Sequence, residues 1–213
     1  MPATPLEFRP ATAADVESAV PLLYSSGPAT FDYVFAPRDS TESFAFLAAA
    51  FRDGAGEFGW RNHLVGVRDG EILAAGAAWD ATCTFAFMRA ATRQILGQRG
   101  LLSGAAVIGR GLAVERVIRP PAEGELYLAH LGVRAERRGE GIGTALVRQL
   151  LAGAVPGRHR RASLDVAVTN PRAQALYERL GFRVIAERRA ALGHGRREVP
   201  GHRRMVLELD GHP

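Results

Sequence analysis

The chain of 213 residues contains no lysine, and all 27 of its basic residues are arginine. A phosphate-binding loop of the Walker type needs a Gly-Lys pair followed by Ser or Thr, so that kind of nucleotide site is excluded. The formal net charge is +5, but an all-arginine complement indicates a compositional bias as readily as a surface selected to bind nucleic acid. Residues 1–109 hold 8 Arg and 11 acidic residues, whereas residues 110–213 hold 19 and 11. A polyanionic ligand is therefore expected at the second half.

Cysteine and long apolar runs are also scarce. Cys83 is the only cysteine, so no intrachain disulfide can form, and with no basic residue near it a buried apolar role is expected. Residues 1–10 lack the apolar core of a signal peptide, and no apolar run approaches the roughly 18 residues of a membrane span. The histidines His194 and His202 lack metal-ligand spacing with a third candidate. We expect a cytoplasmic protein without a metal or a membrane partner.

The most informative stretch is an apolar run followed by glycines and an amphipathic segment. Residues 125–133 (Glu-Leu-Tyr-Leu-Ala-His-Leu-Gly-Val) predict a buried strand, and the spacing of apolar residues predicts a helix over 144–154. Gly139, Gly141 and Gly143 lie between them. A strand-to-helix turn aims unpaired amides and the positive end of the helix dipole at one point, and glycines let an anion approach. The stretch predicts a phosphate or pyrophosphate site, although such glycines also serve tight packing.

The run Arg138-Gly139-Glu140-Gly141-Ile142-Gly143, after a strand that ends Leu131-Gly132-Val133, resembles the coenzyme A pyrophosphate loop of the GNAT superfamily of acyl-CoA-dependent N-acyltransferases. A dinucleotide fingerprint fits poorly, because Thr144 stands where its third glycine belongs. The superfamily's second signature also follows in order, after a predicted strand at 162–168. The matching residues are Asn170, Ala173, Leu176, Tyr177, Gly181 and Phe182.

The resemblance implies one GNAT-type domain over 1–213, of mixed α/β class, with a mostly antiparallel sheet flanked by helices. The pattern of the remaining chain predicts strands at 6–9, 62–67, 71–78, 183–188 and 203–209, and helices at 14–24 and 41–51. Asp69-Gly70 between apolar runs indicates a hairpin. A helical pair at 82–119 departs from the superfamily's compact core. Its position suggests a role on the acceptor side or in a subunit contact, and a homodimer is left open.

The same resemblance implies which residues bind acetyl-CoA. The coenzyme would contact the backbone of Leu131, Gly132 and Val133, the run from Arg138 to Thr144, and the second signature at Asn170, Ala173 and Tyr177. The connection at Phe31, Asp32 and Tyr33 would border the acceptor together with Tyr127, although packing of these aromatic residues in the core is the alternative.

Direct acyl transfer needs a base for the amine, an oxyanion site and a proton for the departing thiolate. Tyr177 matches the general acid of many superfamily members, with packing on its helix as the alternative. Glu125 matches the catalytic glutamate of some histone-acetylating members, whereas other members use a chain of water molecules. Strand alternation places Tyr127, Ala129 and Leu131 on the face of Glu125 and His130 on the other face, where a core histidine is expected.

Together these features predict an N-acetyltransferase that moves an acetyl group from acetyl-CoA to a primary amine of a small molecule or peptide. The alternatives are a non-catalytic acyl-CoA-binding sensor and, third, a nucleic-acid-binding module. The acceptor's identity and the acyl chain preference are left open.

Overall fold

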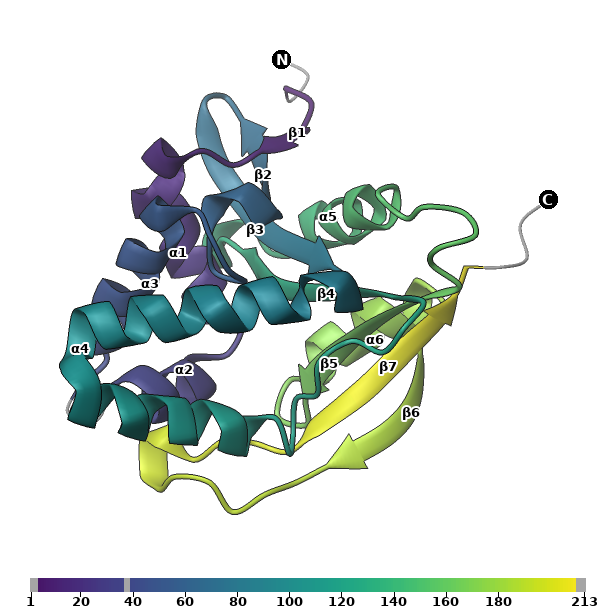
Figure 1. Cartoon of the computed structure of the whole chain (residues 1–213). Helices are drawn as coiled ribbons and strands as arrows, with labels where there is room; N and C mark the ends of the chain where they lie inside the picture. The colour runs from purple at the N-terminus through teal and green to yellow at the C-terminus, as the bar shows by residue number, and fades with distance from the viewer. Residues whose placement is uncertain (1–3, 37–38, 210–213) are drawn as a thin grey trace.

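The computed structural model describes residues 4–36 and 39–209. One seven-stranded sheet, in the order β1-β2-β3-β4-β5-β7-β6, organises the chain (Figure 1). Every neighbouring pair is antiparallel except β4 with β5. The strands are β1 (Glu7–Pro10), β2 (His63–Arg68), β3 (Glu71–Trp79), β4 (Glu125–Val133), β5 (Arg161–Ala167), β6 (Arg183–Arg188) and β7 (His202–Glu208). The predicted mixed α/β class with a mostly antiparallel sheet is confirmed.

Helices cover both faces of this sheet and leave two hydrophobic cores. They are α1 (Val16–Ser25), α2 (Pro28–Phe35), α3 (Thr41–Asp53), α4 (Thr84–Val114), α5 (Ile142–Leu151) and α6 (Pro171–Arg179). One core gathers residues of α1, α2, α3 and α4, and the other gathers residues of α5 and α6 against β4, β5 and β7. Among the described residues, none of the helices combines the length and apolarity that crossing a bilayer requires.

Local signals account for much of this order. Asp69 and Gly70, which join β2 to β3, have φ of 52° and 78°, as the predicted tight hairpin turn requires. The segment predicted as a helical pair at 82–119 is α4, which is broken at Gly100 (φ 70°) and turns back on itself at the front of the molecule (Figure 1). Ile95 and Val107, one from each arm, are buried in the first core. The insertion is therefore an integral part of that core.

The central feature of the sheet is a divergence between β4 and β5. Within the described residues their parallel pairing covers only three pairs and ends at Tyr127 and Ser163. Beyond that point β5 remains paired with β7 on its other edge, up to Ala167 with His202. The second half of β4 consequently faces β5 with an unpaired edge, and a ligand can lie between the two strands.

A bulge in β4 changes which side chains share a face. Ala75 pairs with Gly132 and Ala77 with Ala129, so His130 and Leu131 together lie opposite the single residue Gly76. His130 takes a left-handed φ of 55°. Its ring lies 5.5 Å from that of Trp79, on the Tyr127 face, whereas Leu131 packs in the second core. The alternation predicted from the sequence is therefore wrong for His130 and Leu131, because the extra residue shifts the period.

Gly132 lies where α1 packs closely against β4. A Cβ at this position would lie 2.1 Å from the carbonyl oxygen of Leu22 in α1, a backbone atom that has no freedom to yield. We expect Gly132→Ala to lower the free energy of unfolding by about 3 kcal/mol through overpacking. Thermal or urea denaturation measures the loss.

Gly97→Ala is the matched control for this substitution. Gly97 lies inside α4, and a Cβ there would meet no atom within 4 Å. Because alanine favours a helix over glycine by about 1 kcal/mol, this variant is expected to be as stable as the wild type or more so. If Gly132→Ala is also neutral, α1 does not pack rigidly on β4.

Candidate active site

The glycine-rich turn between β4 and α5 has the geometry of an anion cradle. Gly139 and Gly141 take left-handed φ values of 95° and 80°, and Gly141 directly precedes the first residue of the ten-residue helix α5. No atom lies within 4 Å of the position that a Cβ of Gly141 would occupy. The first amides of α5 have no intrahelical acceptors and point toward this open space. The residues present therefore fit a phosphate or pyrophosphate group.

The charges around the turn favour the same ligand. Glu140, the only acid within the Arg138–Gly143 run, is neutralised by Arg68 at 2.8 Å and by Arg137 at 3.1 Å. The guanidinium of Arg172, the second residue of α6, lies 3.8 Å from the position of a Cβ on Gly139. Sequence reasoning missed Arg172, although its place two residues after Asn170 in the basic half of the chain was a usable signal.

The other residues predicted in the coenzyme loop have distinct environments. Arg138 Nε lies 3.4 Å from the carbonyl oxygen of Val133, at the base of the turn. Ile142 is buried in the second core, so only its backbone is available to a ligand. Gly143 packs toward α6, because a Cβ there would lie 3.2 Å from Leu176. Thr144 is half-buried.

The unpaired edge of β4 presents backbone amides to the gap beside β5. The amide of Arg134 donates to Leu73 of β3 at 2.9 Å, so the amide of Val133 points to the opposite edge, toward that gap. The amide of Leu131, two residues earlier, faces the same way. These amides can bind an amide-bearing ligand or a carbonyl oxygen laid along the strand.

The second signature places Tyr177 behind the same gap. Asn170 accepts a hydrogen bond from the amide of Ala173 at 3.1 Å and thereby caps α6. One turn further, the ring of Tyr177 is buried and lies 6.1 Å from that of Phe182. Burial raises the pKa of Tyr177 to about 12. Its hydroxyl has no hydrogen-bond partner among the described residues, so its proton is available to a ligand.

Glu125 lies in a buried network of charges. Its carboxylate accepts from Arg204 Nη2 at 2.6 Å, Arg161 Nε at 2.9 Å, Ser163 Oγ at 3.0 Å and the Ala122 amide at 3.1 Å. Burial opposes ionisation, but the Ala122 amide and Arg204 outweigh it and hold the pKa of Glu125 below its usual value. This geometry favours a structural role that ties β4 to β5 and β7, and a lowered pKa makes a weaker base.

Glu125→Gln separates the structural role from the predicted catalytic one. Removing the charge leaves buried Arg204 with fewer partners, and breaking such a pair typically costs about 3–5 kcal/mol. We expect a loss near the lower end of that range, because the amide keeps hydrogen bonds and Asp165 remains 2.7 Å from Arg204. Denaturation measures the loss. A fully stable variant with a selective loss of activity near neutral pH would instead support Glu125 as the base.

Tyr127 is buried and belongs to the same network. Its hydroxyl donates to Asp165 Oδ2 at 3.1 Å, and the Arg204 guanidinium lies 4.8 Å from its ring centroid. The rings of Tyr127 and Trp79 lie 5.6 Å apart. Asp165 Oδ1 is buried and has no partner among the described residues. The predicted acceptor residue Tyr127 therefore lies where β4 and β5 begin to diverge, with its hydroxyl already in use.

Phe31, Asp32 and Tyr33, the three residues predicted to border the acceptor, all lie on α2 but have different environments. Phe31 is buried, and its ring lies 6.1 Å from that of His130. The carboxylate of Asp32 accepts hydrogen bonds from three hydroxyls, those of Tyr24, Ser40 and Ser43. Such saturation favours a structural role for Asp32.

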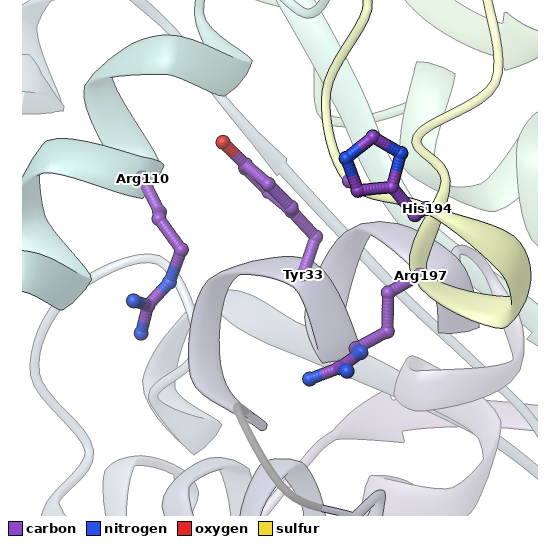
Figure 2. Close-up of a pocket in the computed structure, with 5 residues that line it drawn as sticks. Tyr33, Arg110, His194 and Arg197 are labelled. Atoms are coloured by element: carbon purple, nitrogen blue, oxygen red, sulfur yellow. The ribbon is translucent and has the colours of Figure 1, made fainter.

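Tyr33 alone of the three lines a described pocket. This hollow of about 240 Å³ is lined by Tyr33, Arg110, Gly193, His194 and Arg197. Figure 2 shows Tyr33 standing on α2 between Arg110 of α4 and the loop that carries His194. The guanidinium groups also serve the helix: Arg110 donates to Val34 O and Arg197 to Ala36 O at the C-terminal end of α2. Their positive charge interacts favourably with the negative end of the helix dipole and stabilises α2.

Two further features were not predicted from the sequence: the pairing of His63 with His130, which was expected only as a core histidine, and the raised pKa of Glu57. His63 of β2 and His130 of the β4 bulge stack at 5.4 Å between ring centroids and share a hydrogen bond of 3.2 Å. Burial lowers the pKa of His63 to about 4, and burial together with His63 lowers that of His130 well below its usual value. Burial and the charge of Glu115 raise the pKa of Glu57 to about 7. Their spacing in the sequence carries no signal, because the fold alone brings them together.

No cluster of three or more His, Cys, Asp or Glu side chains suited to a metal ion occurs within residues 4–36 and 39–209. Cys83 is partly exposed rather than buried, so the environment expected for it from the sequence is wrong. It is the residue directly before α4 and packs against the small cluster of Trp79 and Tyr127.

Comparison with known proteins supports the resemblance found in the sequence. The sequence profile of the Acetyltransferase (GNAT) family matches residues 35–182. A 5-NmdU N-acetyltransferase of Pseudomonas phage PaMx11 is 38% identical over 74 residues, which is 35% of this chain and 49% of that protein. The match thus spans about half of that relative's length.

Solved structures share the fold at low sequence identity. An N-acetyltransferase from Staphylococcus aureus Mu50 has a TM-score of 0.69 at 16% identity, covering 94% of this chain and 100% of its own. The Salmonella typhimurium protein yncA, solved with its cofactor acetyl-CoA, has a TM-score of 0.53 at 15% identity, with 99% and 97% covered. The polyamine N-acetyltransferase of Drosophila melanogaster has a TM-score of 0.55 at 18% identity, with 96% and 100% covered.

Proposed function

The chain belongs to the Acetyltransferase (GNAT) family, and we propose on this basis that it transfers an acetyl group from acetyl-CoA to a primary amine. One observation carries the proposal: the divergence of β4 from β5 opens a slot that begins at Tyr127 and leads to the glycine turn at the start of α5. A long ligand with a polyanionic end fits this slot, with its phosphates at the turn and its amide-bearing arm along β4.

Backbone groups provide most of the coenzyme site in this proposal. The amides that follow Gly141 bind the pyrophosphate, and Arg138 and Arg172 add positive charge beside it. The amides of Leu131 and Val133 bind the pantetheine arm and the thioester oxygen. Oxyanion stabilisation by fixed donors is typically the largest single contribution to acyl transfer. Asn170 and Ala173 contribute by holding the start of α6 in place.

Tyr177 is the proposed general acid. When the amine nitrogen bonds to the thioester carbon and the carbon–sulfur bond breaks, the departing thiolate needs a proton. A pKa of about 12 keeps Tyr177 protonated throughout the neutral range. Full transfer to a thiolate, whose conjugate acid has a pKa near 8.5, is uphill by about 5 kcal/mol. The hydroxyl therefore acts first as a hydrogen-bond donor to the developing negative charge on sulfur.

A thiol-release assay tests this function. Purified protein is incubated with acetyl-CoA and a panel of small and peptide amines, and free coenzyme A is measured with the acetylated product identified by mass spectrometry. Amine-dependent thiol release supports the proposal. Tight binding of acetyl-CoA without transfer to any amine would favour the acyl-CoA sensor instead.

We propose that α4 carries a contact between two copies of this chain. Five large apolar side chains on this helix are exposed, and the exposed fractions of Leu101 and Leu102 reach 78% and 91%. The others are Phe85, Met88 and Leu112. We expect a homodimer in sedimentation velocity experiments and a monomer after Leu101→Glu with Leu102→Glu. A wild-type monomer at high concentration would contradict the proposal.

A further inference from the structure

His130 is held in one tautomer by a chain of hydrogen bonds. The carbonyl oxygen of Gly59 can only accept, so Nδ1 of His63, 2.9 Å away, carries the proton. His63 is neutral at physiological pH, because burial lowers its pKa to about 4, and its Nε2 is then a hydrogen-bond acceptor. This nitrogen lies 3.2 Å from Nδ1 of His130, so Nδ1 of His130 must donate. The remaining nitrogen of His130, Nε2, is left with a lone pair.

The position of that lone pair is unusual for a packed histidine. The ring is fixed by Phe58 at 5.3 Å and by Trp79 at 5.5 Å, yet the residue remains partly exposed. Among the described residues, Nε2 of His130 has no hydrogen-bond partner. Nor is it among the fully buried side-chain atoms that lack a partner, so the atom itself is accessible. It is therefore open to solvent or to a ligand. The bulge brings it to the Tyr127 face of β4, immediately before the amide of Leu131.

We propose that Nε2 of His130 is the base that takes the proton from the acceptor amine, with His63 as the residue that positions it. This inference rests on the proposed acetyl transfer. The neutral amine nitrogen bonds to the thioester carbon, its excess proton passes to Nε2, the carbon–sulfur bond breaks and the sulfur takes a proton from Tyr177. Solvent then returns the proton from His130 to Tyr177, so that the products are the amide and the coenzyme thiol.

The environment suits this step. The ring of His130 is mostly enclosed, which lowers its pKa, while Nε2 remains open; it is therefore a modest base that is neutral at pH 7. A nitrogen already bonded to the carbonyl carbon is a far stronger acid than a free ammonium ion, so a modest base suffices. Protonation at Nε2 also leaves the Nδ1 hydrogen bond to His63 intact. Among the described residues, the ionisable groups in this region include Glu57, next to Phe58 in sequence, and Tyr127, a neutral group whose pKa is raised chiefly by burial and in small part by Glu57.

Chemical rescue tests the assignment. His130→Ala is expected to lower kcat about 10²-fold, within the range of general base catalysis. Added imidazole should restore activity at least tenfold, whereas pyrazole, which has the same shape but is a far weaker base, should not. Equal rescue by both would show that the ring only fills space. A wild-type rate in His130→Ala would overturn the proposal, as would loss of activity in Glu57→Gln with His130→Ala still active.

Two further measurements do not depend on His130→Ala folding. Nitrogen-15 NMR of the wild-type histidines should show His130 protonated at Nδ1 only, and protonation at Nε2 would overturn the proposal. His63→Gln, which keeps an oxygen acceptor for Nδ1, should retain most of the activity that His63→Leu loses. If the wild type transfers no acetyl group to any amine, the proposed function fails. If it does transfer one but these results do not appear, the role of His130 alone fails.

Discussion

Tyr177→Phe is expected to lower kcat by about 10²-fold or more and to leave the affinity for acetyl-CoA nearly unchanged. The substitution removes only the hydroxyl, whose pKa of about 12 makes it a proton donor at every pH used in an assay. Steady-state kinetics with a saturating amine give kcat, and calorimetric titration gives the coenzyme affinity.

The structure offers an internal control for this variant. The Tyr177 hydroxyl has no hydrogen-bond partner among the described residues, while its ring packs beside Phe182 in the second core. Phenylalanine keeps that packing and breaks no hydrogen bond, so the melting temperature should be equal to the wild type's or higher. Loss of activity with unchanged stability would show that the Tyr177 hydroxyl takes part in the reaction. A wild-type rate would leave Tyr177 with packing alone, and the thiolate would then take its proton from water.

Features encoded in short stretches were predictable from the sequence. The hairpin at Asp69-Gly70, the strand–glycine–helix unit around Gly141 and the capped start of α6 at Asn170 are each specified by neighbouring residues. Their physical causes, left-handed backbone and helix capping, act within a few residues. The turn and the caps followed from these local signals, whereas the fold class and the coenzyme loop were predicted through the resemblance of the two signatures to the GNAT superfamily.

The chemistry of the site depends on contacts that sequence spacing does not reveal. Glu125 matches a catalytic position by its place in the strand, but its environment is set by Arg204, 79 residues away. His130 was expected in the core because strict alternation was assumed, and one extra residue at the bulge reverses that assignment. Its partner His63 lies 67 residues earlier. A side chain's burial, charge and tautomer are properties of the assembled sheet, so a motif alone does not determine them.

At the glycine-rich turn between β4 and α5, the effect of added charge on coenzyme binding can be separated from the effect of backbone conformation. Gly141→Asp is expected to weaken acetyl-CoA binding by about 10³-fold, or about 4 kcal/mol, because it places a carboxylate against the pyrophosphate. Gly141→Asn is the matched control, since its side chain has nearly the same shape and must adopt the same left-handed φ of 80°. Asparagine and aspartate tolerate that conformation better than other residues, so the strain is similar in both variants.

The difference between the two variants therefore isolates the charge. Calorimetric titration should show a small loss of affinity for Gly141→Asn and a large one for Gly141→Asp, and the thermal stabilisation that acetyl-CoA gives the wild type should vanish only in Gly141→Asp. Because the added charge acts partly through solvent, raising the salt concentration should narrow the gap between the variants. Equal affinities for Asn and Asp would mean that the phosphates bind elsewhere, and the assignment of the α5 turn as the pyrophosphate site would be wrong.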